Sequence, residues 1–188
     1  MTVWVSMLRG VNVGGHSRIK MKPLQELYEF LGLQNVRTML QSGNVLFTSG
    51  LKDRDRLARR IEQEIERRFE LKVTVLLRTL GDLKMLVERG PTLAENADPR
   101  KLLVMFLDGV ADARTQKALL TAHKGPEMIE IRGPEIYLYY PDGVGRSKLS
   151  NAFIEARLNL AGTSRNWNTL KKLIEAGNAI EAGSPRAA

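Results

Sequence analysis

Hydrophobic positions in the first 80 residues switch between the spacing of strands and the spacing of helices. Short apolar runs predict strands, and apolar residues repeating every three or four positions predict helices. Together they predict strand, helix, strand, strand, helix and strand over residues 2–9, 22–31, 36–40, 45–48, 53–69 and 73–77. This order is the split βαβ arrangement of a ferredoxin-like fold.

The same order returns in the second half of the chain. After a bridging helix over 80–89, the pattern predicts the six elements again, the last being a short edge strand after Leu160, and then a final helix near 168–176. The segments VSMLRGV (5–11) and VMFLDGV (104–110) match at an offset of 99 residues. We therefore expect an α+β fold of duplicated ferredoxin-like (split βαβ) halves, with antiparallel sheets and packed helices.

The second round of elements also defines the expected domain boundaries. Its strand, helix, hairpin and helix are predicted over 101–107, 112–123, 128–131 with 136–140, and 147–160. We expect a first half over 1–78, a bridging helix and loop over 79–100, a second half over 101–176 and a flexible tail over 177–188. The halves are expected to form one compact unit.

One long connection distinguishes the first half. The hairpin turns at Gln41 and Arg132 lie 91 residues apart, eight fewer than the offset of the first strands, so the first half has extra residues before its hairpin. They fall in RGVNVGGHSRIKMK at 9–22, which we call the glycine-rich loop. Because the second half is predicted to fold without such a loop, the first half does not need the loop to fold. Long loops in compact domains are often functional.

The glycine-rich loop resembles a P-loop but departs from it at the decisive position. Gly10 to Ser17 reads G-x-x-x-x-G-H-S, with His16 where a P-loop needs lysine, and Pro23 predicts that the helix begins several residues later. A P-loop nucleoside triphosphatase is therefore not favoured. A simpler anion site is favoured, because backbone amides near glycines and the basic residues Arg9, Arg18, Lys20 and Lys22 attract phosphate. The alternative is a solvated loop whose charges only keep it soluble.

Composition narrows the ligand class. A net charge of +8 and a pI near 9.9 favour an anionic partner, such as nucleic acid, a phosphorylated metabolite or an acidic protein surface. The absence of cysteine excludes disulfides and thiolate chemistry, and two histidines make a histidine metal cage unfavourable, so no metal site is expected. The N-terminus lacks signal-peptide features and no apolar run approaches 18 residues, so we expect a cytoplasmic protein without a membrane partner.

Two further basic segments lie near the C-terminus. In YYPDGVGRSKLSNAF, Ser147 is predicted to cap a helix beside Arg146 and Lys148, which would make an anion site; a capped helix after a Pro-Asp-Gly turn is the alternative. In TSRNWNT, Trp167 offers a stacking plane flanked by polar side chains for a base or sugar. The alternative is a tryptophan that closes the edge of the core, with asparagines capping the next helix.

The segments at 8–47 and 145–173 resemble the two signature segments of the bacterial domain of unknown function 1697 family, and the resemblance spans nearly the whole chain. It implies a duplicated ferredoxin-like α+β fold but no established activity, cofactor or catalytic residue. His16 occupies a position where lysine would also suit the family pattern. The motif positions are Arg9, Gly10, Asn12, Gly14, Gly15, Gln41, Ser42, Gly43, Asn44, Gly145, Arg146, Ser147, Lys148, Asn151, Arg165, Asn166, Trp167 and Asn168.

These patterns favour a binding module for a phosphate-bearing ligand, with nucleic acid as one candidate. An enzyme acting on a small phosphorylated metabolite, with His16 or Ser17 transferring a proton, and a protein-interaction or structural protein without a ligand are the alternatives. No nucleophile elbow, metal spacing or carboxylate pair identifies a reaction, so the catalytic residues and any cofactor stay open. The expected ligand-binding residues are Arg9, Gly10, Asn12, Gly14, Gly15, His16, Arg18, Lys20, Arg146, Ser147, Lys148, Arg165, Asn166, Trp167 and Asn168.

Overall fold

The computed structural model describes residues 1–12, 19–92 and 97–183. Its contacts divide the chain into two compact units: a first unit, Met1–Glu88 with Lys171–Ala188, and a second unit, Arg89–Leu170. Each unit is taken by itself below. The expectation that the two halves form one compact unit stays a prediction.

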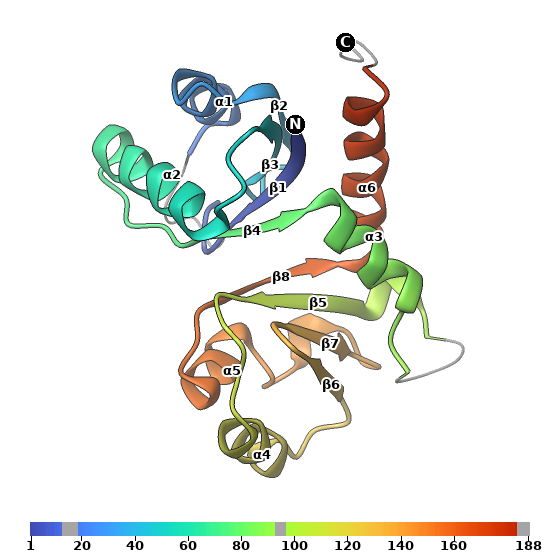
Figure 1. Cartoon of the computed structure of the whole chain (residues 1–188). Helices are drawn as coiled ribbons and strands as arrows, with labels where there is room; N and C mark the ends of the chain where they lie inside the picture. The colour runs from blue at the N-terminus through green and yellow to red at the C-terminus, as the bar shows by residue number, and fades with distance from the viewer. Residues whose placement is uncertain (13–18, 93–96, 184–188) are drawn as a thin grey trace. The chain divides into compact units, whose positions relative to one another are not determined.

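The first unit contains the predicted split βαβ order, then a helix after its last strand, and most of the C-terminal helix α6 (Trp167–Glu181) (Figure 1). Its sheet is antiparallel, with the strand order β2-β3-β1-β4. The elements are β1 (Thr2–Leu8), α1 (Met21–Phe30), β2 (Gln34–Met39), β3 (Asn44–Ser49), α2 (Arg54–Phe69), β4 (Val75–Thr79) and α3 (Leu80–Arg89).

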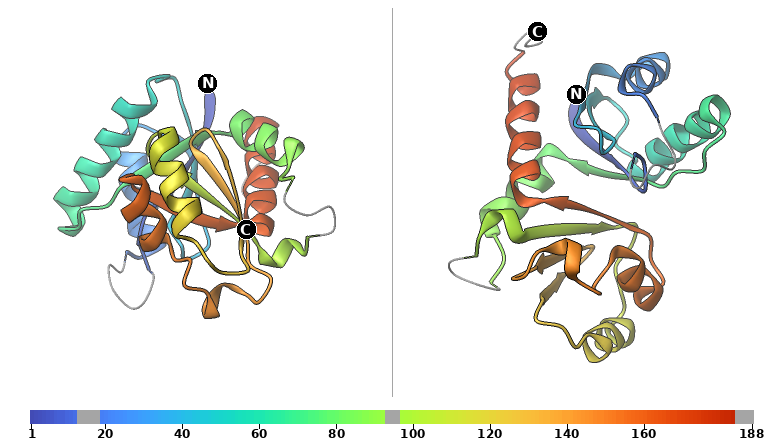
Figure 2. Two further views of the ribbon diagram at one scale, coloured as in Figure 1. Left: turned by 90° about the horizontal axis from the view of Figure 1, so that it is seen from below. Right: turned by 180° about the vertical axis from the view of Figure 1, so that it is seen from behind.

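Helices α1 and α2 cover one face of this sheet (Figures 1 and 2). Trp4, Leu8 and Phe47 from the strands are buried there against apolar side chains of both helices. The Tyr28 hydroxyl of α1 shares a buried hydrogen bond of 2.7 Å with the Ser6 hydroxyl of β1. Each large apolar side chain buried in this way stabilises the fold by about 1.5–3 kcal/mol, so alternation along the strands fixes which face meets the helices.

The second unit repeats the order and the sheet. Its antiparallel sheet has the strand order β6-β7-β5-β8, which places β8 at an edge as expected. Its elements are a 3-10 turn η1 (Pro99–Lys101), β5 (Leu102–Leu107), α4 (Ala113–Ala122), β6 (Met128–Arg132), β7 (Glu135–Tyr139), a 3-10 turn η2 (Val144–Arg146), α5 (Asn151–Leu158) and β8 (Gly162–Asn166). The predicted duplicated α+β fold is confirmed.

Strand registers support the offset of 99 residues read from the sequence. Val5 of β1 lies opposite Arg78 of β4, and Val104 of β5 lies opposite Arg165 of β8. Both arginines are buried, and each donates a hydrogen bond from its guanidinium to the carbonyl of the preceding residue. Equivalent strands of the two units therefore carry the same unusual side chain at the same register.

Helix α6 (Trp167–Glu181) follows β8 directly and ends later than the boundary expected at 176. A Cβ atom at Gly177 would lie 2.6 Å from a methyl group of Leu80, so α6 packs closely against α3 in the first unit. This close packing explains why the helix continues into the segment expected to be a flexible tail. None of the helices in the described ranges is long and apolar enough to cross a membrane.

The predicted helix over 147–160 is shorter in the structure, and its predicted N-cap at Ser147 is wrong. Helix α5 begins at Asn151, and the Ser150 hydroxyl caps it by accepting a hydrogen bond from the Phe153 amide. Ser147 instead ends the η2 turn, because its hydroxyl is held by Glu127 and by the Leu149 amide. Helix-terminal amides therefore do not converge beside Ser147.

Candidate functional site

The two units differ in the connections between equivalent elements. In the first unit the link from β1 to α1 spans residues 9–20, against 108–112 for the link from β5 to α4. In the second unit the link from α4 to β6 spans 123–127, against 31–33, and the link from β7 to α5 spans 140–150, against 50–53. Each unit thus has long connections at positions where the other unit has short ones.

These long connections lie at opposite ends of the shared fold. The link from β1 leaves the sheet where the first strand ends. Because β7 runs antiparallel to β5, the link from β7 leaves where the first strand begins, and the link after α4 returns to that same end. The second unit therefore carries two long links side by side at one end of its sheet.

At the glycine-rich loop of the first unit, Asn12 joins the two ends of the loop. Its side-chain amide donates to the carbonyls of Ile19 and Gln41, at 3.0 and 2.7 Å, and its side-chain oxygen accepts from the Ile19 amide at 2.9 Å. Nearby, the buried Asn44 amide donates to the Met39 carbonyl and the Ser42 hydroxyl. These motif residues therefore shape the loop base and the β2–β3 turn.

The remaining loop residues proposed as ligands are only partly described. Arg9 and Lys20 are exposed, and Gly10 has a φ of +71°, the left-handed conformation that glycine tolerates best. Gly14, Gly15, His16 and Arg18 lie outside the described residues. The predicted loop site stays a prediction.

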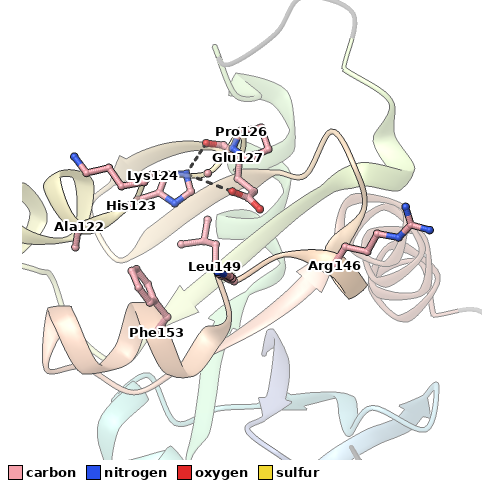
Figure 3. Close-up of a pocket in the computed structure, with 10 residues that line it drawn as sticks. Ala122, His123, Lys124, Pro126, Glu127, Arg146, Leu149 and Phe153 are labelled. Atoms are coloured by element: carbon pink, nitrogen blue, oxygen red, sulfur yellow. Dashed lines mark hydrogen bonds and ion pairs between the residues drawn. The ribbon is translucent and has the colours of Figure 1, made fainter.

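In the second unit the two long links enclose a cavity of about 450 Å³ (Figure 3). Its walls come from the end of α4 and the segment after it, and from the end of η2, the segment after it and the start of α5. It is lined by Ala122, His123, Lys124, Gly125, Pro126, Glu127, Arg146, Lys148, Leu149 and Phe153. We call this cavity the second-unit pocket; its volume falls in the range typical of small-molecule sites.

His123 and Glu127 line one side of the pocket and form a hydrogen-bonded cluster with Ser147, which does not itself line the cavity. The Ser147 hydroxyl donates to the Glu127 carboxylate, and the His123 Nε2 lies 2.9 Å from the Glu127 carbonyl oxygen and 3.5 Å from its carboxylate. Only 8% of the Glu127 side chain and 13% of the His123 side chain are exposed. The hydrogen bond from Ser147 lowers the pKa of the Glu127 carboxyl below its ordinary value, although burial opposes this effect.

The order of contacts in this cluster differs from that of a catalytic triad. In a triad the histidine lies between the nucleophilic hydroxyl and the carboxylate. Here the Glu127 carboxylate lies between Ser147 and His123, and the Ser147 oxygen also accepts from the Leu149 amide at 2.9 Å. The cluster thus joins the two long links and orients the His123 ring, and its contacts do not have the order of a triad.

Gly125 lies directly against the Glu127 carboxylate and the His123 ring. A Cβ atom there would lie 2.0 Å from a carboxylate oxygen of Glu127 and 3.0 Å from the His123 ring. Any larger residue must displace the carboxylate. A side chain at this position would therefore change the placement of the Glu127 carboxylate beside His123.

Cationic side chains surround the pocket. Lys124, Arg146 and Lys148 are all exposed, and Lys124 and Arg146 extend outward from opposite sides of the cavity in Figure 3. Within the described ranges, none of the three is in an ion pair, and Glu127 is the only acid that lines the cavity. Long, exposed cations can turn toward an anion, so the pocket combines mostly apolar walls with a positive rim.

The third predicted segment has mainly structural contacts. Arg165 is buried, its guanidinium donates to the Thr163 hydroxyl at 2.8 Å, and burial lowers its pKa to about 10. Asn166 donates to the Arg100 carbonyl at 2.9 Å and accepts from the Asn168 amide. Trp167 is buried, with its ring 6.4 Å from that of Tyr137. This geometry matches the alternative in which Trp167 closes the core and Asn166 caps α6, while Asn168 is exposed.

The structure thus places Arg146 and Lys148 at one pocket, with Ser147 bonded to its Glu127 wall. It adds His123, Lys124 and Glu127, which the sequence analysis did not propose. The signal for them was HKGPE, a connection longer than its counterpart at 31–33 and rich in polar residues. No group of three or more metal-ligating side chains occurs among the residues that the structure describes.

Comparison with known proteins identifies the family. The model of a family described as a protein of unknown function (DUF1697) matches residues 1–137. The chain belongs to this family. The first signature segment, 8–47, lies inside the matched range, whereas the second, 145–173, lies beyond it, so the match is shorter than the resemblance suggested.

A solved structure supports the same fold. The chain is similar to a conserved bacterial protein from Streptococcus pneumoniae, with 22% sequence identity, a TM-score of 0.71, and coverage of 94% of this chain and 98% of that one. At this identity the similarity shows the fold alone. No curated protein matches the sequence.

Proposed function

We propose that this protein is a binding module for a phosphate-bearing small molecule, and that the second-unit pocket holds this ligand. The observation that carries the proposal is the charge around the cavity. Three exposed cations line it, and its single carboxylate is already held by neighbouring groups. A phosphate group entering the pocket would meet three positive side chains against the one negative charge of Glu127.

The other walls favour a ligand with an apolar body. Ala122, Pro126, Leu149 and Phe153 are the apolar side chains among the lining residues. The Arg157 guanidinium lies 3.4 Å from the centre of the Phe153 ring on α5. Binding sites of this kind commonly combine apolar walls with a few polar groups that orient the ligand. A phosphorylated metabolite or a nucleoside monophosphate has this combination.

Calorimetric titration with inorganic phosphate, pyrophosphate and adenosine monophosphate tests the proposal. We expect wild-type protein to bind at least one probe and the variant Arg146→Ala with Lys148→Ala to lose tenfold or more in affinity, since a hydrogen bond to a charged group contributes about 1.5–3 kcal/mol. The matched control is Arg114→Ala with Lys117→Ala, which removes two exposed cations of the same unit that do not line the pocket. Equal loss in both variants would indicate a general effect of charge and would contradict a pocket site.

Nucleic acid remains the alternative ligand, through the glycine-rich loop. Fluorescence anisotropy with labelled single-stranded RNA, at about 50 and about 200 mM salt, separates the two ligands, because binding through several phosphates weakens by orders of magnitude over this range. Salt-sensitive RNA binding that Arg18→Ala with Lys20→Ala abolishes would favour the loop. Binding of a small phosphate ester that this variant leaves unchanged would favour the pocket.

A further inference from the structure

The tautomer of His123 follows from its contacts. A carbonyl oxygen can only accept a hydrogen bond, so the 2.9 Å contact between Nε2 and the Glu127 carbonyl requires Nε2 to carry the hydrogen. The Glu127 carboxylate, 3.5 Å from the same nitrogen, favours the same arrangement. In the neutral ring, Nδ1 therefore has a lone pair and no hydrogen.

This second nitrogen is on the cavity side of the ring. Figure 3 shows Nε2 turned toward Glu127 and the other ring nitrogen turned toward Leu149, across the pocket. When His123 gains a proton, the proton is added at Nδ1, because Nε2 is already occupied. The atom that faces the ligand then changes from an acceptor, which repels an anion, to a donor in a cation.

We propose that the second-unit pocket binds dianions coupled to the uptake of one proton by His123, so that its affinity for sulfate or phosphate rises as the pH falls. This inference rests on the proposed function and adds how the same site is regulated. Glu127 is a positioning residue here: it holds Nε2 and leaves Nδ1 as the proton-accepting atom.

The other charged groups near the ring do not supply this coupling. Glu127 is the one acid at the cavity in the described chain, and its lowered pKa keeps it ionised at neutral and mildly acidic pH. Lys124, Arg146 and Lys148 line the cavity, and Arg157 lies over Phe153 on α5. Lysine and arginine keep their charge through the range in which histidines ordinarily titrate, about pH 5 to about pH 8. Tyr140 also stays neutral, since burial raises its pKa to about 12.

Sulfate is the probe that isolates the histidine, because it stays a dianion throughout this range while phosphate does not. We expect the dissociation constant of sulfate to fall about tenfold or more from pH 8 to pH 5 in wild type, the size expected for one added hydrogen bond to a charged group. His123→Gln retains a donor that can reach the Glu127 carbonyl but cannot titrate, so its sulfate affinity should not depend on pH. Arg114→Ala with Lys117→Ala, which removes two exposed cations away from the pocket and retains His123, is the control and should keep the pH dependence of wild type.

A second measurement keeps the test valid if His123→Gln fails to fold. Calorimetry of sulfate binding to wild type near pH 7, in two buffers of different ionisation enthalpy, counts the protons taken up directly. We expect a fraction between zero and one in wild type. No proton uptake, or pH-independent binding, overturns the inference while leaving the proposed function standing; no binding of sulfate or phosphate at any pH overturns both.

Discussion

The two units have the same strand order and nearly the same strand registers, yet their long connections lie at opposite ends of the fold. The first unit is extended after its first strand, over 9–20, and the second unit after α4 and β7, over 123–127 and 140–150. Buried strands and helix faces fix the framework, because a register shift of one residue would turn every core side chain outward. Connections at the ends of a sheet are free of this constraint, so each copy can carry a different site.

The polar side chains in the long connections of the two units also have different hydrogen-bond partners. In the first unit the side chains of Asn12 and Asn44 form hydrogen bonds with backbone carbonyls of the loop and turn. In the second unit Ser147 and Glu127 bond to each other, while Arg146 and Lys148 are exposed at the cavity. The motif residues of this chain thus divide into those that shape turns and those whose cationic side chains are exposed at the cavity.

The largest expected effect is on stability, from Asn12→Ala in the first unit. This change removes three hydrogen bonds and places alanine at a φ of +58°. We expect the free energy of unfolding to fall by about 2–4 kcal/mol, measured by urea denaturation. Asn12→Gly tolerates the positive φ and should lose less. A loss below about 0.5 kcal/mol for Asn12→Ala would show that the loop base is not held by this side chain.

The next effect is on the pocket, from Gly125→Ala. The new methyl group displaces the Glu127 carboxylate, so sulfate affinity should fall about tenfold, while the free energy of unfolding changes by about 1 kcal/mol. Gly145→Ala is the control, since nothing lies within 4 Å of a Cβ atom there. If both variants bind sulfate as tightly as wild type, sulfate binding does not depend on the arrangement of His123 and Glu127. The second unit would then not differ from the first by a binding site at this pocket.

The pH dependence of stability allows a buried carboxylate of each unit to be compared, Glu64 in the first and Glu127 in the second. In the first unit, hydrogen bonds from Arg67 and then Arg68 on α2 hold the Glu64 carboxylate and lower its pKa to about 2. A carboxyl whose pKa is lowered on folding stabilises the protein above its unfolded pKa, near 4.5, and this stabilisation is lost as the pH falls toward 2.

The test compares wild type with Glu64→Gln by thermal unfolding between about pH 6 and about pH 2.5. Wild type should be the more stable at the upper end, and the difference should shrink as the pH falls. Glu127→Gln should show the same direction of pH dependence, and also alter sulfate binding, which Glu64→Gln should not. A difference that grows on acidification would reverse the sign and exclude this ion pair as its source.

The smallest expected effect comes from Trp4 in the core of the first unit. Its indole N–H is buried without a hydrogen-bond partner in the described structure, and the equivalent position in the second unit, Leu103, has no polar atom. Trp4→Phe removes part of a buried ring but also an unpaired donor, so the two effects oppose each other. We expect a net change within about 1 kcal/mol by urea denaturation. A loss of about 3 kcal/mol or more would show that the N–H is satisfied in solution.

Much of the framework could be predicted from the sequence, since burial imposes a period of two on strands and about 3.6 on helices. The α3 helix was predicted at its observed bounds, and most strand ends lie within two residues. The helix predicted from Ser147 was wrong at its start because both Ser147 and Ser150 suit a cap. Only the contact of Ser147 with Glu127, 20 residues away, decides between them.

The pocket could be predicted only in part, because it too depends on contacts between residues that are distant in sequence. Arg146, Ser147 and Lys148 stood out as a local basic segment. His123 and Glu127 did not, because their partners are distant in sequence and a single histidine in a polar link has no distinctive period. Long connections relative to the other copy are the signal that would have found both segments.

The most direct test of the account is the location of the bound anion. Backbone amide chemical shifts of isotope-labelled protein, followed by NMR during titration with inorganic phosphate, report which residues the anion approaches. We predict saturable shifts at residues 123–127 and 146–149, with unchanged amides around Asn12 and Gln41. Shifts confined to the segments flanking the glycine-rich loop, with the pocket unaffected, would contradict the assignment of the ligand to the second unit.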